Sequence, residues 1–209
     1  MTAFAVGFDL DMTLVDSRPG IAATFRLLGA LTGVDIDADA VVARLGPPLE
    51  QEIARWYPAD QVTAAAARYR ELYPDHAVVS SPALPGAADA LAAVRAAGGR
   101  VVVVTAKMPA LAELHLRHLG LPYDELYGFA WADGKSAALK AAGATVYVGD
   151  HVADMVAARE AGVFGIGVTT GPCAAGELVV AGADAVLPDL LGFPALLAQI
   201  RLGRGDSGG

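Results

Sequence analysis

The second half of the chain alternates between helix-forming and strand-forming segments, and this alternation constrains the fold more than any other feature. Residues 85–97 are rich in alanine and end at a Gly-Gly pair, as helices often do, and the β-branched run 100–104 follows at once. The pattern then repeats, with helices expected over 109–119, 135–142 and 152–161 and strands over 144–148 and 163–168. Strands that are apolar throughout are covered on both faces, as in a parallel sheet. The sequence therefore predicts a doubly wound α/β fold.

Residues 17–82 interrupt this alternation. They contain helical stretches over 21–31, 49–57 and 61–73 but no comparable strand, and they end in a Ser-Ser-Pro segment with the composition of a linker. We therefore expect an all-helical cap domain inserted into a Rossmann-like, mainly parallel catalytic core. The predicted domains are 1–16 with 83–202 for the core, 17–82 for the cap and 203–209 for a disordered tail.

Composition limits the partners. The 209 residues are 55% apolar, which is enough to fill a large core, and the net charge of −8 disfavours nucleic acid and acidic membrane surfaces, which require a positive field. The chain has one cysteine, Cys173, and shows neither a secretory signal pattern nor a membrane span. We expect a cytoplasmic protein that binds a small molecule, and the sequence does not predict its oligomeric state.

Polar side chains follow three predicted strands, which are the apolar run 4–8 near the start of the chain, 100–104 and 144–148. In an open parallel sheet the ligand site lies beyond the carboxyl ends of the strands, so these side chains are expected to converge. They are Asp9 with Asp11, Thr105, and Asp150 with Asp154, joined by Lys135 at the start of a helix. Each residue alone has an ordinary structural explanation, but together they predict an active site. Two carboxylates as close as Asp9 and Asp11 require a cation or a shared proton, and Mg²⁺ would suit both.

This set of residues resembles the haloacid dehalogenase superfamily, specifically its phosphatases with a helical C1-type cap after the first motif. The first motif, Phe-Asp-Leu-Asp-Met-Thr-Leu-Val-Asp-Ser over 8–17, is most similar to phosphoglycolate phosphatases and their relatives. Those proteins commonly have glycine where this chain has Met12. The carboxylates are intact, so the departure affects the subfamily and the substrate more than the chemistry.

The resemblance implies a Mg²⁺-dependent phosphatase that hydrolyses a small phosphate monoester, with phosphoglycolate as one candidate. Asp9 would be the nucleophile that forms an aspartyl-phosphate, and Asp11 the general acid and base. Thr105, Ala106 and Lys135 would bind the transferring phosphoryl group.

The resemblance also implies a metal site. Mg²⁺ would be held by the Asp9 carboxylate, the Asp11 backbone carbonyl and Asp150. Asp154 would act as a ligand through water or as a support for the other ligands.

Other charged residues are weaker candidates. In the predicted cap, Arg18 and Arg44 are candidate substrate-binding residues, and a surface position is an equal alternative for each. His115 and His118 lie three residues apart on one predicted helix, but no third ligand accompanies them, so we interpret them as a solvated pair.

Several alternatives follow from the same motifs. A phosphonate-cleaving relative would need a lysine in the cap to form a Schiff base, and no lysine precedes Lys107. A carbon–halogen-cleaving relative typically lacks the second aspartate, whereas Asp11 is present here. A sugar-phosphate mutase and a catalytically silent binding protein both remain open.

Overall fold

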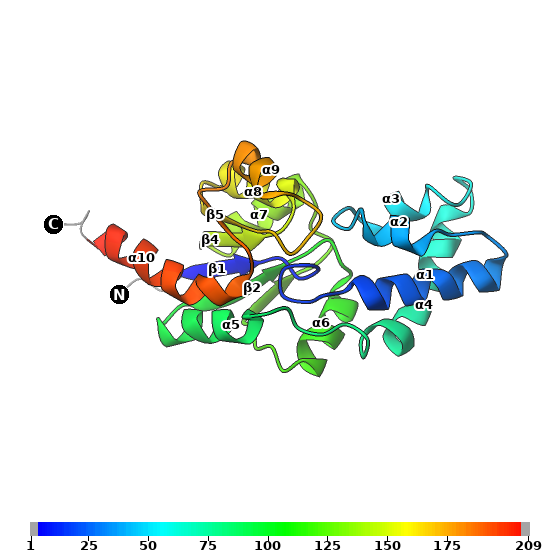
Figure 1. The fold of residues 1–209 in the computed structure, drawn as a ribbon, viewed down its shortest axis with the longest axis horizontal. Helices are drawn as coiled ribbons and strands as arrows, with labels where there is room; N and C mark the ends of the chain where they lie inside the picture. Colours follow the sequence, from blue (N-terminus) through cyan, green and yellow to red (C-terminus); the bar gives the residue numbers. More distant parts are fainter. Residues whose placement is uncertain (1–3, 206–209) are drawn as a thin grey trace.

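The computed structural model describes residues 4–205, which form a central parallel sheet flanked by helices (Figure 1). All six strands run parallel, in the order β3-β2-β1-β4-β5-β6. The strands are β1 (Ala5–Phe8), β2 (Arg100–Val104), β3 (Glu125–Tyr127), β4 (Ala144–Gly149), β5 (Phe164–Val168) and β6 (Ala185–Leu187). The strand order reverses beside β1, which is where a doubly wound sheet forms its ligand crevice.

Helices cover both faces of the sheet. Successive residues of β2 point to opposite faces, so Val101 and Val103 pack in one hydrophobic cluster while Val102 and Val104 pack in another. The core helices are α5 (Ala87–Ala96), α6 (Pro109–His118), α7 (Asp133–Ala141), α8 (Val152–Ala161), α9 (Ala175–Ala181), the 3₁₀ helix η1 (Leu190–Gly192) and α10 (Phe193–Gly205). The first cluster includes residues of α5, α6 and α10, and the second includes residues of α7 and α8. The predicted doubly wound α/β fold is confirmed.

Between β1 and α5 the chain forms four helices, which lie to one side of the sheet (Figure 1). They are α1 (Arg18–Thr32), α2 (Ala38–Val42), α3 (Leu49–Ile53) and α4 (Val62–Ala77), and we call residues 17–82 the insert. Buried side chains of the insert form their own hydrophobic cluster, joined by Leu111 of α6. The insert therefore rests on α6 as well as on its two chain connections.

The two connections of the insert run side by side. Asp16 N donates to Pro82 O at 2.9 Å, Leu84 N donates to Leu14 O at 2.9 Å, and Val15 forms an antiparallel bridge with Ala83. The chain thus leaves and re-enters the core at neighbouring points.

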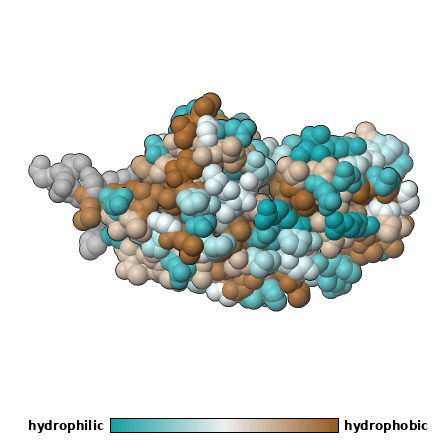
Figure 2. Space-filling model, in the orientation of Figure 1, coloured by the Kyte–Doolittle hydropathy of each residue, from teal (hydrophilic) through white to brown (hydrophobic). Residues whose placement is uncertain are grey.

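Some elements lie outside the predicted pattern. The strands β3 and β6 have three residues each, too few for an apolar run to stand out, and α2, α9, η1 and α10 were also not predicted. The helix α10 continues through residues 203–205 of the expected disordered tail, and residues 206–209 lie outside the described residues. The face of the molecule in Figure 2 carries hydrophilic and hydrophobic residues interspersed with one another. No helix in residues 4–205 is long and apolar enough to cross a membrane.

Candidate active site

Three strand ends bring the polar residues together. Phe8 of β1 is aligned with Val103 of β2 on one side and with Val148 of β4 on the other. Because these strands are parallel and in register, the residues that follow them, Asp9, Thr105 and Asp150, lie at one edge of the sheet. All three side chains are buried, so the site is enclosed on the core side.

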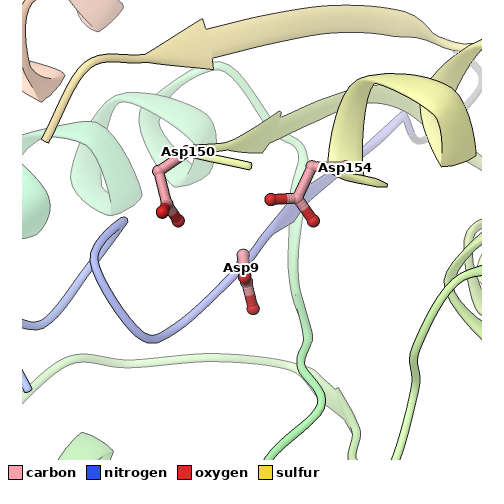
Figure 3. A group of neighbouring side chains, drawn as sticks. All are labelled: Asp9, Asp150 and Asp154. Atoms are coloured by element: carbon pink, nitrogen blue, oxygen red, sulfur yellow. The ribbon is translucent and has the colours of Figure 1, made fainter. Parts of the chain in front are cut away.

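The carboxylates of Asp9, Asp150 and Asp154 form a buried acidic cluster (Figure 3). One oxygen atom from each lies within 4.8 Å of the others. Burial, with the neighbouring Asp154 charge, raises the pKa of Asp9 to about 7 although Lys135 opposes the shift. Burial, with Asp154 and Asp9 nearby, also raises the pKa of Asp150 well above its ordinary value. The cluster contains more negative charge than its one ammonium group neutralises.

Lys135 is the ammonium group within this cluster. It lies in the first turn of α7, where Lys135 Nζ is 2.9 Å from Asp9 Oδ2 and 2.5 Å from Asp154 Oδ1. The two carboxylates more than offset the effect of burial, so the pKa of Lys135 is raised and the side chain stays charged. Lys135 therefore provides a fixed positive charge beside Asp9.

Both oxygens of Asp154 have protein partners. Oδ1 accepts from Lys135 Nζ and, at 3.0 Å, from the Tyr147 hydroxyl, while Oδ2 accepts from His151 N at 3.0 Å. Gly149 makes room for this carboxylate, since a Cβ there would collide with the Asp154 carboxyl group. These contacts suit Asp154 to holding Lys135 and the start of α8 in place.

Asp150 is held on one side and open on the other. Its Oδ1 accepts from Thr13 Oγ1 at 2.9 Å, and its Oδ2 has no hydrogen-bond partner among the described residues. The loop after β5 lies close to this carboxylate, since a Cβ at Gly171 would collide with Oδ2. An accessible carboxylate oxygen beside Asp9, among three carboxylates that share one ammonium group, fits a divalent cation. Asp9 and Asp150 are therefore the core of a candidate site for a divalent metal.

Asp11 forms a separate ion pair. Lys107 Nζ lies 2.9 Å from each carboxylate oxygen of Asp11 and 4.8 Å from the centre of the Tyr73 ring. Burial alone would raise the pKa of Asp11, but the Lys107 ammonium holds it below its usual value. Asp11 is therefore ionised in this arrangement.

A pocket lies between the strand ends and the insert. Its floor includes Asp9, Asp11, Thr105 and Ala106, and its roof comes from α1, the loop between α2 and α3, and α4. The structure thus places these predicted residues on one pocket, while Lys135, Asp150 and Asp154 lie behind it in the acidic cluster.

The two candidate arginines have different positions. Arg44 lines the pocket, where its Nη2 lies 2.6 Å from Oε1 of Glu52. Arg18 is half exposed, pairs with Asp16 at 2.8 Å and is not among the residues that line the pocket. The structure does not bring Arg18 to the site.

Met12 adopts a backbone conformation that favours glycine. Its φ is 61°, and its side chain is buried. The turn is held by Met12 N, which donates to Val15 O at 2.8 Å, and by Met12 O, which accepts from Thr170 Oγ1 at 2.5 Å. The methionine therefore keeps the turn that glycine would form, and the carboxylates on either side keep their places.

The interpretation of His115 and His118 as a solvated pair is wrong for His115. That ring is fully buried, and its Nε2 lies 2.9 Å from the Tyr73 hydroxyl. The error arises because the insert packs on α6, a tertiary contact that helix spacing does not report. Burial lowers the pKa of His115 to about 4, so it is neutral at pH 7.

The insert also meets the core at His151. Gly46, with φ 135°, lies so close that a Cβ there would be 2.9 Å from His151 Cδ2. The His151 ring is 5.5 Å from the Trp131 ring between centroids, and its Nδ1 accepts from Ala153 N at 3.1 Å. His151 is thus held from the core side while the insert loop packs on it.

Sequence reasoning missed several residues of the site. Lys107 and Thr13 follow strand ends as closely as the predicted residues do, so proximity to the strand end was the available signal. Gly171 follows β5, and the strand-end rule applied to that strand points to the same loop. The contact between Tyr73 and His115 has no comparable signal in the sequence.

Several known proteins are similar to this chain in sequence and in fold. The family model described as haloacid dehalogenase-like hydrolase matches residues 6–159. The chain is 33% identical over 220 residues to a plasmid-encoded phosphoglycolate phosphatase of Cupriavidus necator, with 95% of this chain and 94% of the relative covered. It is 32% identical over 191 residues to a probable phosphatase of Dickeya dadantii, covering 78% and 80%. A haloacid dehalogenase-like hydrolase structure from Streptococcus pneumoniae matches with a TM-score of 0.81 at 28% identity, covering 94% of this chain and all of that one.

Proposed function

The chain belongs to the haloacid dehalogenase-like hydrolases, and from that membership we propose how its own residues hydrolyse phosphate monoesters. It is a phosphatase of this family, and its curated relatives named phosphoglycolate phosphatase make phosphoglycolate one candidate substrate. The observation that carries the proposal is the position of Asp9, buried at the end of β1 beside Lys135 and on the floor of the pocket.

In the first step a carboxylate oxygen of Asp9 attacks phosphorus, and the bond from phosphorus to the leaving oxygen breaks. Asp11 is ionised while Lys107 holds it, so it first takes up a proton from solvent water, and its contact with Lys107 weakens as it becomes neutral. Asp11 then donates this proton to the leaving oxygen. Thr105 and the backbone at Ala106 are positioned at the pocket floor to bind the phosphoryl oxygens, and Lys135 offsets the charge that gathers beside Asp9.

In the second step water attacks the phosphorus of the aspartyl-phosphate, and the bond to Asp9 breaks to release inorganic phosphate. Asp11 accepts the proton from this water. The Lys107 ammonium favours the ionised form of Asp11, which is the form that this step requires.

Mg²⁺ is the divalent ion we assign to the cluster, because its ligands are carboxylate and carbonyl oxygens and it binds phosphoryl groups readily. Asp9, the Asp11 backbone carbonyl and Asp150 would hold it. When bound, it supplies positive charge to the transferring phosphoryl oxygens. Asp154 already bonds Lys135, Tyr147 and His151, so we assign it to positioning rather than to direct ligation.

We propose that residues 17–82 form a cap domain over a catalytic core of residues 1–16 and 83–202. The cap would close the pocket, which residues of both parts line. A mutase is not favoured, since two relatives that are more than 30% identical over more than three quarters of the chain are both named phosphatases. A catalytically silent protein is not favoured either, because the turn at Met12 leaves both carboxylates in place.

The test is release of inorganic phosphate from a phosphoester panel with and without Mg²⁺, combined with trapping of the phosphoenzyme by acid quench. Wild type is expected to turn over with Mg²⁺, and Asp9→Asn should lose about a thousandfold or more in kcat and form no phosphoenzyme. Asp39→Asn, at an exposed aspartate of α2, is the matched control. A trapped phosphoenzyme in Asp9→Asn would refute the nucleophile assignment.

A further inference from the structure

The wall of the pocket is mainly apolar and aromatic. The side chains that form it are Ile21, Phe25, Leu45, Tyr69, Tyr73 and Leu111. The Phe25 and Tyr69 rings lie 4.6 Å apart between centroids, and Tyr69 lies 5.5 Å from Tyr73, so three rings form a continuous surface. Such a surface favours a leaving group with apolar area to bury.

Each cation that lines the pocket among the described residues already has a carboxylate partner. The pairs are Arg44 with Glu52 at 2.6 Å, Arg70 with Glu50 at 2.6 Å, and Lys107 with Asp11 at 2.9 Å. Glu52 itself lines the pocket. An acidic group on the substrate would have to compete with one of these carboxylates for its cation or stay unpaired in a mainly apolar pocket, and either is costly.

The Tyr69 hydroxyl distinguishes this pocket from ordinary internal packing. The side chain of Tyr69 is buried, yet its hydroxyl has no hydrogen-bond partner among the described residues, whereas the Tyr73 hydroxyl contacts His115. This hydroxyl is open to the pocket rather than sealed in the core. A polar group that lines an apolar pocket without a protein partner is where a ligand can supply the missing hydrogen bond.

We propose that the substrate is a phosphate monoester of an uncharged, ring-sized and largely apolar alcohol, whose leaving group packs on the wall formed by Phe25, Tyr69 and Tyr73. This inference rests on the proposed phosphatase function. Phosphoglycolate suits the wall less well, because its leaving group is small and carries a carboxylate.

Turnover of matched substrates tests the inference. Benzyl phosphate and 4-carboxybenzyl phosphate share ring size and differ in charge, and phosphoglycolate adds a small acidic leaving group. With Mg²⁺ present, kcat/KM for benzyl phosphate is expected to exceed both others by about tenfold or more. Equal or higher values for either acidic substrate would overturn the inference.

A binding measurement separates this inference from the proposed function. A phosphonate has a carbon–phosphorus bond in place of the ester bond, so a phosphatase does not hydrolyse it. The dissociation constants of 2-phenylethylphosphonate and its 4-carboxy derivative therefore measure binding in the pocket without turnover. Calorimetry should show the uncharged phosphonate binding about tenfold or more tightly. If no phosphoester were turned over but this preference held, the phosphatase proposal would fail and the pocket inference would stand; equal binding would remove the pocket inference.

A variant tests the role of the paired cations. Glu52→Gln leaves Arg44 without its carboxylate, so the ratio of kcat/KM for 4-carboxybenzyl phosphate to that for benzyl phosphate should rise by about threefold or more. Glu71→Gln removes an exposed ion pair with Arg68 that does not line the pocket, and should leave the ratio unchanged. A ratio that is the same in Glu52→Gln and wild type would contradict the claim that these pairs exclude acidic leaving groups.

Discussion

Lys135 Nζ lies 2.9 Å from Oδ2 of Asp9, and both side chains are buried. The ammonium also lies 2.5 Å from Asp154 Oδ1, so a second buried carboxylate holds it in place. A buried charge that is fixed in this way has two consequences. It stabilises the fold only while its partners are present, and it provides positive charge at one defined point of the site.

Removal of this charge should destabilise the protein. Lys135→Met leaves Asp9 and Asp154 buried without their counter-charge, and we expect the free energy of unfolding to fall by about 3 kcal/mol. Urea unfolding at pH 7.5 measures this value. Lys140→Met, at an exposed lysine of the same helix, should change it by less than about 0.5 kcal/mol. Equal stabilities of the two variants would contradict the importance of the buried pairs.

The buried His115 predicts a dependence of stability on pH. Its pKa is lowered to about 4 in the folded state, chiefly by burial, from 6.5 in the unfolded chain. Between these values the unfolded chain binds a proton that the folded protein does not, so the free energy of unfolding falls as pH falls through this window. From pH 7.5 to pH 5 this histidine should account for a loss of about 2 kcal/mol.

The measurement is urea unfolding at both pH values for wild type, His115→Gln and His118→Gln. The loss attributed to His115 should disappear in His115→Gln and persist in His118→Gln, because His118 is exposed on the same helix. If His115→Gln lost as much stability as wild type over this range, another group would have to be the cause.

The contact of Gly46 with His151 predicts a defect in activity that is separate from stability. In Gly46→Ala the new Cβ would lie 2.9 Å from His151 Cδ2, so the insert loop has to move away from the core. We expect kcat/KM to fall by about tenfold. Gly33→Ala is the control, since Gly33 also has a positive φ, of 74°, but a Cβ there meets nothing within 4 Å.

Both glycine variants should lose about 1 kcal/mol of stability from the strained backbone, and only Gly46→Ala should lose activity. Initial-rate kinetics and urea unfolding on the same preparations give both values. A Gly33→Ala enzyme with the same loss of kcat/KM would show that backbone strain, and not the contact with His151, is responsible.

Met12→Gly tests whether the methionine limits turnover. The backbone already has the φ that glycine adopts freely, so kcat should stay within about threefold of wild type. Loss of the buried side chain should lower the free energy of unfolding by about 2 kcal/mol, after the relief of backbone strain is included. A rise in kcat of tenfold or more would mean that Met12 restrains the enzyme.

The sequence predicted the parts of this molecule that depend on local patterns. Apolar β-branched runs such as 100–104 indicated the buried strands, and parallel strand ends then placed Asp9, Thr105 and Asp150 at one edge. The ion pair of Lys107 with Asp11 was not predicted, because it joins residues 96 positions apart whose spacing has no local pattern. The burial of His115 depends in the same way on the insert packing against α6.

The hydrogen bond between Asp16 N and Pro82 O also bears on how this chain can be altered. Because the two connections of the insert are already neighbours, a loop of a few residues can span the gap between them, and the entropy of loop closure changes only slowly with its length. We therefore expect that a different roof could replace residues 17–82 while every strand of the sheet keeps its register. If the proposed roles hold, the part of the protein that breaks the phosphate ester and the part that selects the alcohol would be exchangeable modules.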